Sequence, residues 1–176
     1  MAVIVNAANC SVAPAAGGAW VITKTGGDPA AADASAVSTA PIAGDFVLRA
    51  RRLNTVVGYC GAAADPAGEG FATIDWAVQI SGATARVYES GAFQPPLFAV
   101  AGFVWLRRTG TVLQYLIGAD LATTVLKRTV TGVSGPYYFD SAILTAGGQL
   151  EVKFDVPAAF APTRARRRTL GFGLGL

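Results

Sequence analysis

The chain of 176 residues contains no histidine. Histidine is the commonest general base in enzymes and the commonest protein ligand of metal ions, so Ser-His and Cys-His nucleophile pairs are excluded. The two cysteines, Cys10 and Cys60, are too few and too far apart for a zinc knuckle. We therefore expect a protein that is not an enzyme and that holds neither a cofactor nor a tightly bound metal.

Charged residues and long apolar runs are also scarce. The sequence is 52% hydrophobic and 14% charged, but no run approaches the ~18 apolar residues that a membrane-spanning helix needs. The N-terminus lacks a basic segment followed by an apolar block, so we expect no secretory signal and favour two reduced thiols over a Cys10–Cys60 disulfide. Basic residues crowd into positions 164–168, which leaves the rest of the chain nearly neutral despite a net charge of +3. Because most of the chain is nearly neutral and lacks a long apolar run, we expect neither membrane insertion nor binding to nucleic-acid phosphates.

The residues that are present divide the chain into three parts. Residues 1–44 alternate short apolar pieces with Gly, Pro, Ala and Ser, which predicts an extended arm with short strands that becomes ordered against neighbouring subunits. From residue 45 to residue 156, strand signals recur at the spacing expected of a sandwich or barrel. Residues 157–176 form a tail rich in Pro, Arg and Gly.

The strands of the central part are predicted from alternating apolar and polar residues. Phe46–Arg52 and Gln149–Asp155 keep their apolar residues on one face, which indicates antiparallel sheets with one face on a core. Residues 103–106 and 112–117 are apolar runs around a Thr-Gly turn and predict a hairpin. Residues 90–96 are predicted to be a loop. The residues that this parity predicts to be buried are Ile74, Trp76, Val78, Trp105, Leu150, Val152 and Phe154.

About ten strands between residues 45 and 155 predict an all-β, two-sheet antiparallel jelly-roll sandwich. Four stretches set the order of its strands and turns: residues 86–91 (RVYESG), 103–118, 135–143 (GPYYFDSAI) and 150–154 (LEVKF). In this order the chain resembles concanavalin A-like jelly-roll modules of the kind found in bacteriophage virion proteins and bacterial surface proteins. The resemblance implies the fold rather than an activity, because the matching residues belong to strands and turns and not to a catalytic motif.

A concanavalin A-like fold directs attention to carbohydrate binding, which uses an aromatic face together with polar side chains that hydrogen-bond sugar hydroxyls. The candidate glycan-binding residues are Tyr88, Tyr137, Tyr138 and Asp140, together with Trp76 and Trp105. The alternative is that the tyrosines close the ends of the core while Trp76 and Trp105 fill it. Asparagine occurs only three times, so a calcium-assisted lectin loop, which needs clustered oxygen ligands, is not expected.

Glycoside hydrolysis would need two carboxyl groups facing one cleft. Glu151 and Asp155 have a suitable spacing along one strand. They share their face with Gln149 and Lys153, which indicates a solvated surface rather than a catalytic pair.

The tail alternates large apolar residues with Thr and Gly and follows a basic cluster. Such a segment would expose apolar side chains in a monomer, yet it suits addition to the sheet or groove of another chain. The preceding arginines could pair with acidic groups of that partner. A disordered tail is the alternative. The predicted subunit-docking residues are Arg164, Arg166, Arg167, Arg168, Leu170, Phe172, Leu174 and Leu176.

Two classes of function follow from these observations. The favoured one is a non-enzymatic structural subunit of a phage-like virion, such as a head fibre, capsid decoration or tail fibre, assembled in the host cytoplasm. Its partners would be copies of itself in a symmetric oligomer, other virion subunits and a host-surface glycan. The composition, rich in Ala, Arg and Gly and poor in Lys, suits a phage of a GC-rich host. The alternative is a bacterial surface carbohydrate-binding module.

Overall fold

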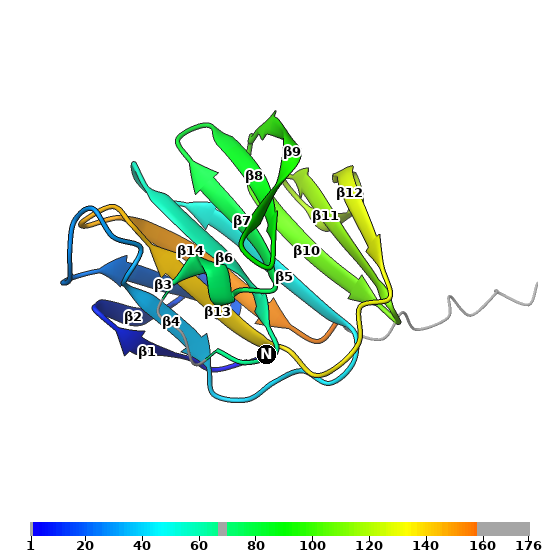
Figure 1. Cartoon of the computed structure of the whole chain (residues 1–176), viewed down its shortest axis with the longest axis horizontal. Helices are drawn as coiled ribbons and strands as arrows, with labels where there is room; N and C mark the ends of the chain where they lie inside the picture. The colour runs from blue at the N-terminus through cyan, green and yellow to red at the C-terminus, as the bar shows by residue number, and fades with distance from the viewer. Residues whose placement is uncertain (1, 67–69, 158–176) are drawn as a thin grey trace, which may run out of the picture.

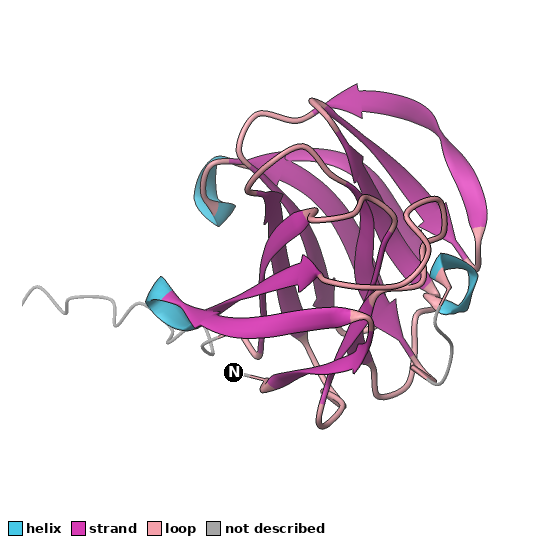
Figure 2. Ribbon diagram, turned by 90° about the vertical axis from the view of Figure 1, so that its left-hand side faces the viewer, coloured by secondary structure: helices cyan, strands magenta, loops and turns pink. Residues whose placement is uncertain are grey.

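The computed structural model describes residues 2–66 and 70–157, and strands dominate this part of the chain (Figures 1 and 2). Fourteen strands form two seven-stranded antiparallel sheets there. In spatial order, sheet A consists of β1 (Ile4–Ala8), β4 (Ser35–Ser38), β13 (Tyr138–Ile143), β6 (Val57–Ala63), β7 (Trp76–Ser81), β8 (Thr84–Glu89) and β9 (Ala92–Ala99). Sheet B consists of β12 (Val125–Thr131), β11 (Val112–Gly118), β10 (Phe103–Thr109), β5 (Phe46–Arg52), β14 (Gln149–Asp155), β3 (Ala19–Lys24) and β2 (Cys10–Ala15).

The helical content of the described residues consists of three single-turn 3-10 helices. Figure 2 shows them as short cyan turns among the strands. They are η1 (Ala16–Gly18), η2 (Phe71–Thr73) and η3 (Leu121–Thr123). Within residues 2–66 and 70–157, no helix is long and apolar enough to cross a membrane.

The predicted all-β, two-sheet antiparallel sandwich is confirmed, and its core lies between the sheets. Phe154 of β14 contacts Phe46 of β5 within sheet B, with ring centroids 5.2 Å apart. It also contacts Phe139 of β13 in sheet A, at 6.3 Å. All three rings are completely buried. Large aromatic side chains bury the most apolar area per residue, so this cluster is a major source of cohesion between the sheets.

The N-terminal residues 2–44 are part of the sandwich. Strands β1 and β4 extend sheet A beyond β13, while β3 and β2 extend sheet B beyond β14 (blue in Figure 1). The expectation that this segment becomes ordered only against neighbouring subunits is therefore wrong. This segment folds with the rest of the chain despite its small side chains, because β4 pairs with β13 and β3 pairs with β14, which satisfies backbone hydrogen bonds. Ala34 and Ala36 are also completely buried in the core.

The predicted strands Phe46–Arg52 and Gln149–Asp155 are confirmed to the residue. The predicted hairpin is also present, with β10 and β11 joined by Gly110 and Thr111. Gly110 has a φ of 58°, which the tight turn requires and glycine adopts without steric cost. The predicted loop at residues 90–96 is wrong, because Ala92–Ala99 is strand β9. Its two prolines are tolerated because β9 is the outermost strand of sheet A.

Burial is confirmed for all but one of the residues predicted to be buried. The exception is Trp76, which is only half-buried at the start of β7, although it does pack against the core. Trp105 is 8% exposed, yet it belongs to the outer face of sheet B, in register with Arg49 of β5. The predicted solvated face of β14 is also partly covered, since Glu151 is contacted by Arg49 and Arg51.

Both cysteines are buried thiols, as favoured from the sequence. The Cys10 Sγ donates a hydrogen bond to the Ser35 carbonyl oxygen at 3.0 Å. Burial raises the pKa of Cys10 to about 11 and that of Cys60 to about 12. Because the thiolate is the reactive form, both side chains are poor nucleophiles at neutral pH.

Replacing Phe154 by alanine is expected to lower the free energy of unfolding by roughly 3–5 kcal/mol, because the ring's burial is lost and a cavity opens between the sheets. The matched control is Phe93→Ala on β9, where the side chain is 44% exposed and the loss should be far smaller. Urea denaturation followed by tryptophan fluorescence measures both. An unchanged unfolding midpoint for Phe154→Ala would refute this register of the sandwich.

Candidate binding site

The four tyrosine and aspartate residues selected from the sequence do not form one site. Tyr88 and Asp140 lie on the outer face of sheet A in the same row of paired residues, three strands apart. Tyr138 belongs to β13, two positions from Asp140, and is half-buried. Tyr137 lies just before β13 and packs into the core instead. From β8 to β13, the row consists of Tyr88, Ala77, Gly61 and Asp140.

Tyr137 closes one end of the sandwich. Its ring contacts Phe46 edge-on at 6.2 Å, and its hydroxyl donates to the Ser134 carbonyl oxygen at 2.8 Å. The Arg108 guanidinium lies 5.5 Å from the ring centroid. With 5% exposure, this tyrosine has the core-closing role that was the alternative to sugar contact.

Tyr88 belongs to an aromatic cluster on the outer face of sheet A. Tyr59 of β6 stacks on Phe71 of η2 with centroids 4.4 Å apart, and Tyr88 meets both rings edge-on. The Gln79 side-chain amide donates to the Tyr59 hydroxyl at 2.6 Å. Burial, followed by the neighbouring Tyr88, raises the pKa of Tyr59 to about 12. Packing of η2 onto the sheet therefore occupies much of the ring surface that a sugar would need.

Asp140 is buried rather than presented to ligands. Its side chain is 1% exposed, and Oδ1 accepts the Ser141 backbone N–H at 2.7 Å. Oδ2 has no hydrogen-bond partner among the described residues. Burial, opposed only in part by the Ser141 hydrogen bond, raises the pKa of Asp140 from 3.8 to about 8. The carboxyl group is therefore largely protonated at neutral pH and is not available as an exposed acceptor for sugar hydroxyls.

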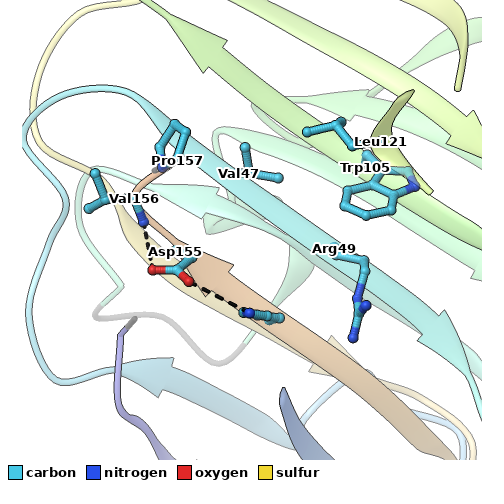
Figure 3. A pocket seen from close by; sticks show the side chains of 8 residues that line it. Val47, Arg49, Trp105, Leu121, Asp155, Val156 and Pro157 are labelled. Atoms are coloured by element: carbon cyan, nitrogen blue, oxygen red, sulfur yellow. Dashed lines mark hydrogen bonds and ion pairs between the residues drawn. The ribbon is translucent and has the colours of Figure 1, made fainter. Parts of the chain in front are cut away.

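A pocket of about 340 Å³ lies on the outer face of sheet B (Figure 3). It crosses β10, β5 and β14, where register places Trp105, Arg49 and Lys153 in one row. Leu121 of η3 forms one wall, and the chain leaving β14 forms another. The lining residues are Val47, Arg49, Trp105, Leu121, Lys153, Asp155, Val156 and Pro157.

The pocket combines an apolar floor with a rim of both charges. Lys153 Nζ is 3.8 Å from Asp155 Oδ2, while Asp155 Oδ1 accepts the Val156 backbone N–H at 2.9 Å. Arg49 donates to Glu151 at 3.1 Å, and its guanidinium lies 4.3 Å from the Phe103 ring centroid. An indole beside hydrogen-bonding side chains can accept a ring that is apolar on one side and hydroxylated at its edge.

The sequence does not indicate this pocket, because its lining residues lie in separate segments of the chain. The sequence pattern groups Trp105 with Trp76 and the tyrosines, as a sugar contact or a core residue, and it places Asp155 on a solvated surface. The alternation of β5 and β14 does place Val47 and Arg49, and likewise Lys153 and Asp155, on one face of each strand. The pairing of β5 with both β10 and β14, which brings these faces together, depends on tertiary structure. Among the described residues, no group of three or more Cys, Asp or Glu side chains could hold a metal ion.

No protein-family model matches the sequence, and no curated protein matches it in the sequence comparison. Solved structures share its fold. The exoplasmic/lumenal domain of VIP36, in a Ca²⁺/Man3GlcNAc-bound form, aligns with a TM-score of 0.54 and 12% identity over 82% of this chain and 80% of that one. The SPRY domain of human HERC1 aligns with a TM-score of 0.53 and 10% identity, over 78% of this chain and 89% of that one. A functionally unknown protein from Saccharomyces cerevisiae aligns with a TM-score of 0.51 and 13% identity, over 89% of this chain and 96% of that one.

At such low identities the likeness shows the fold alone. The chain has a concanavalin A-like lectin/SPRY-type β-sandwich fold, so this part of the resemblance seen in the sequence is confirmed. The link to virion proteins stays a prediction. The predicted docking residues between Arg164 and Leu176 lie outside the described residues.

Replacing Asp140 by asparagine is expected to stabilise the protein increasingly as the pH rises from about 4 to about 8. Over that range the unfolded wild type releases its carboxyl proton while the folded protein, with its raised pKa, retains it, so wild-type stability falls. At pH 7 we expect a gain of at least about 1 kcal/mol, or roughly 2–4 °C in Tm. Thermal unfolding at pH 4, 7 and 9 measures it, with exposed Asp45→Asn as control. Parallel pH profiles for Asp140→Asn and wild type would contradict the burial of an uncompensated carboxyl.

Proposed function

We propose that the protein is a non-enzymatic structural subunit of a phage-like virion: a capsid decoration, head-fibre or tail-fibre subunit present in several symmetric copies. The observation that carries this proposal is a sandwich whose outer strands expose large apolar side chains. Phe93 and Leu97 on β9 are 44% and 47% exposed, and Val125 and Leu126 on β12 are 57% and 50% exposed. Apolar side chains gathered along sheet edges suit contacts with further subunits.

The two exposed edges lie on the same side of the sandwich, where β9 and β12 meet (Figure 1). Arg128 of β12 holds them together through charge-assisted contacts with Glu89 at the end of β8, and through a hydrogen bond of 3.1 Å to Gln94 of β9. These contacts fix the edges in place before any partner arrives. A preformed surface of this kind costs little ordering entropy on assembly.

The tail supplies the second element of the proposal. Its alternation of apolar residues with glycine and its basic cluster suit docking against another subunit, in the host cytoplasm where the particle would assemble. Burying four large apolar side chains contributes on the order of 6–12 kcal/mol, which ordering costs of about 1–2 kcal/mol per residue nearly cancel. Useful docking therefore depends on backbone pairing or on several copies acting together.

A second candidate function is carbohydrate binding at the Trp105 pocket. The observation that favours it is an aromatic ring, Asp155 and Lys153 around one hollow of ligand size. A virion subunit with this pocket could bind a host-surface glycan, and a bacterial surface module could use it in the same way.

Deleting Thr169–Leu176 is expected to leave a folded, soluble sandwich that no longer assembles. Thermal unfolding should be unchanged, while sedimentation velocity should show loss of the oligomer and of co-sedimentation with particles. A second variant, in which Leu170, Phe172, Leu174 and Leu176 are changed to serine, keeps the chain length and should behave in the same way. Normal occupancy of the assembly by either variant would refute the docking role of the tail.

Retention on glycan-coupled columns tests the second candidate. If the pocket binds sugars, Asp155→Asn should weaken retention by about 10- to 100-fold, because a charged hydrogen-bond acceptor is lost. Asp45→Asn, an exposed carboxyl outside the pocket, is the matched control and should bind normally. Failure of the wild type to bind any column of a broad glycan panel, or equal binding by Asp155→Asn, would exclude this function.

A further inference from the structure

The described sandwich has four outermost strands: β1 and β9 in sheet A, and β12 and β2 in sheet B. An outermost strand presents unpaired backbone N–H and C=O groups that can accept a strand from another chain. Natural proteins block such pairing with prolines, short strands or charges. The four edges can therefore be compared for how well each would accept an added strand.

Three of the four edges are poorly suited. Strand β9 contains Pro95 and Pro96, and β2 contains Pro14, so each strand lacks a backbone N–H donor at its proline positions. Strand β1 has only five residues, and its pairing with β4 is interrupted by a register shift. Strand β12 has seven residues and no proline, although its pairing with β11 is also shifted at one point.

The side chains of β12 also leave a row of the core unfinished. Val104 of β10, Ile117 of β11 and Val125 of β12 are paired across sheet B. Their exposure increases outward, from 1% through 8% to 57%. One more strand with a large apolar side chain at this position would continue the row and cover Val125.

A second β12 is a poor occupant of this edge. Antiparallel pairing of two copies about the middle of the strand would place their exposed Lys127 side chains diagonally across from each other, where like charges repel, whereas the charge of Arg128 is compensated by Glu89. Residues 169–176 (TLGFGLGL) carry no charged side chain and no proline. Their large residues fall on one side of an extended chain, and the glycines opposite them allow close approach.

We propose that β12 of one copy accepts residues 169–176 of a neighbouring copy as an added edge strand of sheet B. The proposal rests on the proposed docking role of the tail and names its receiving surface. Repeated around a ring, such an exchange links each subunit to the next by a heterologous contact. The backbone hydrogen bonds of the added strand supply the stabilisation that apolar burial alone does not.

Cross-linking between two differently tagged full-length copies tests this placement. One copy carries Gly173→Cys in the tail, and the other carries Val125→Cys on β12. Two matched partners carry Leu97→Cys on β9 or Val5→Cys on β1, both also at exposed positions. The parental protein is the background control, because Cys10 and Cys60 are buried with pKa values of about 11 and 12 and should not react with a bismaleimide.

We expect the cross-linked heterodimer to form with Val125→Cys in about tenfold or greater excess over the other two partners, because docking raises the local concentration of the reacting thiols. Equal yields, or a preference for Leu97→Cys or Val5→Cys, would overturn the assignment to β12. Cross-linking only within one copy, shown by a protein carrying both Gly173→Cys and Val125→Cys that stays monomeric, would also overturn it. The docking role itself is judged separately by the deletion of Thr169–Leu176, so the two failures are distinguishable.

Discussion

The contact between Phe139 and Phe154 joins the two sheets through β13 and β14, each the neighbour of the middle strand of its sheet, and the other features depend on it. Phe154 lies on β14, which pairs with both β5 and β3, while Phe139 lies on β13, which pairs with β6 and β4. The N-terminal strands and the long hairpins therefore attach to the sandwich from opposite sides of the same pair of strands. Apolar burial at this point holds both outer faces in fixed positions.

The two outer faces are used differently. On sheet A, η2 packs onto Tyr59 and Tyr88, and Asp140 is buried nearby as a carboxyl whose pKa is raised. On sheet B, ion pairs and cation–π contacts around Arg49 leave a hollow beside Trp105. Sheet A therefore buries its polar groups, which costs stability, whereas sheet B leaves Lys153 and Asp155 partly exposed beside the pocket. This difference is why we place a candidate sugar-binding function on sheet B.

The proposed roles in assembly and in binding are compatible because they use separate surfaces. The pocket lies over β10, β5 and β14, whereas the receiving edge is β12, separated from β10 by β11. The chain leaves β14 at Pro157, which is itself a wall of the pocket.

Local sequence patterns were enough to predict the fold class and the best-patterned strands. Strict alternation in Phe46–Arg52 and Gln149–Asp155 gave their bounds because period two matches the pleat of a sheet with one buried face. Alternation could not show that the weakly patterned residues 2–44 would pair with β13 and β14, since partners that distant are chosen by the folded chain. Nor could it place Tyr137 in the core, bury Asp140, or bring Trp105 and Asp155 to the same pocket. Those outcomes follow from strand order and from loops that return over the sheets, which are contacts between residues far apart in the sequence.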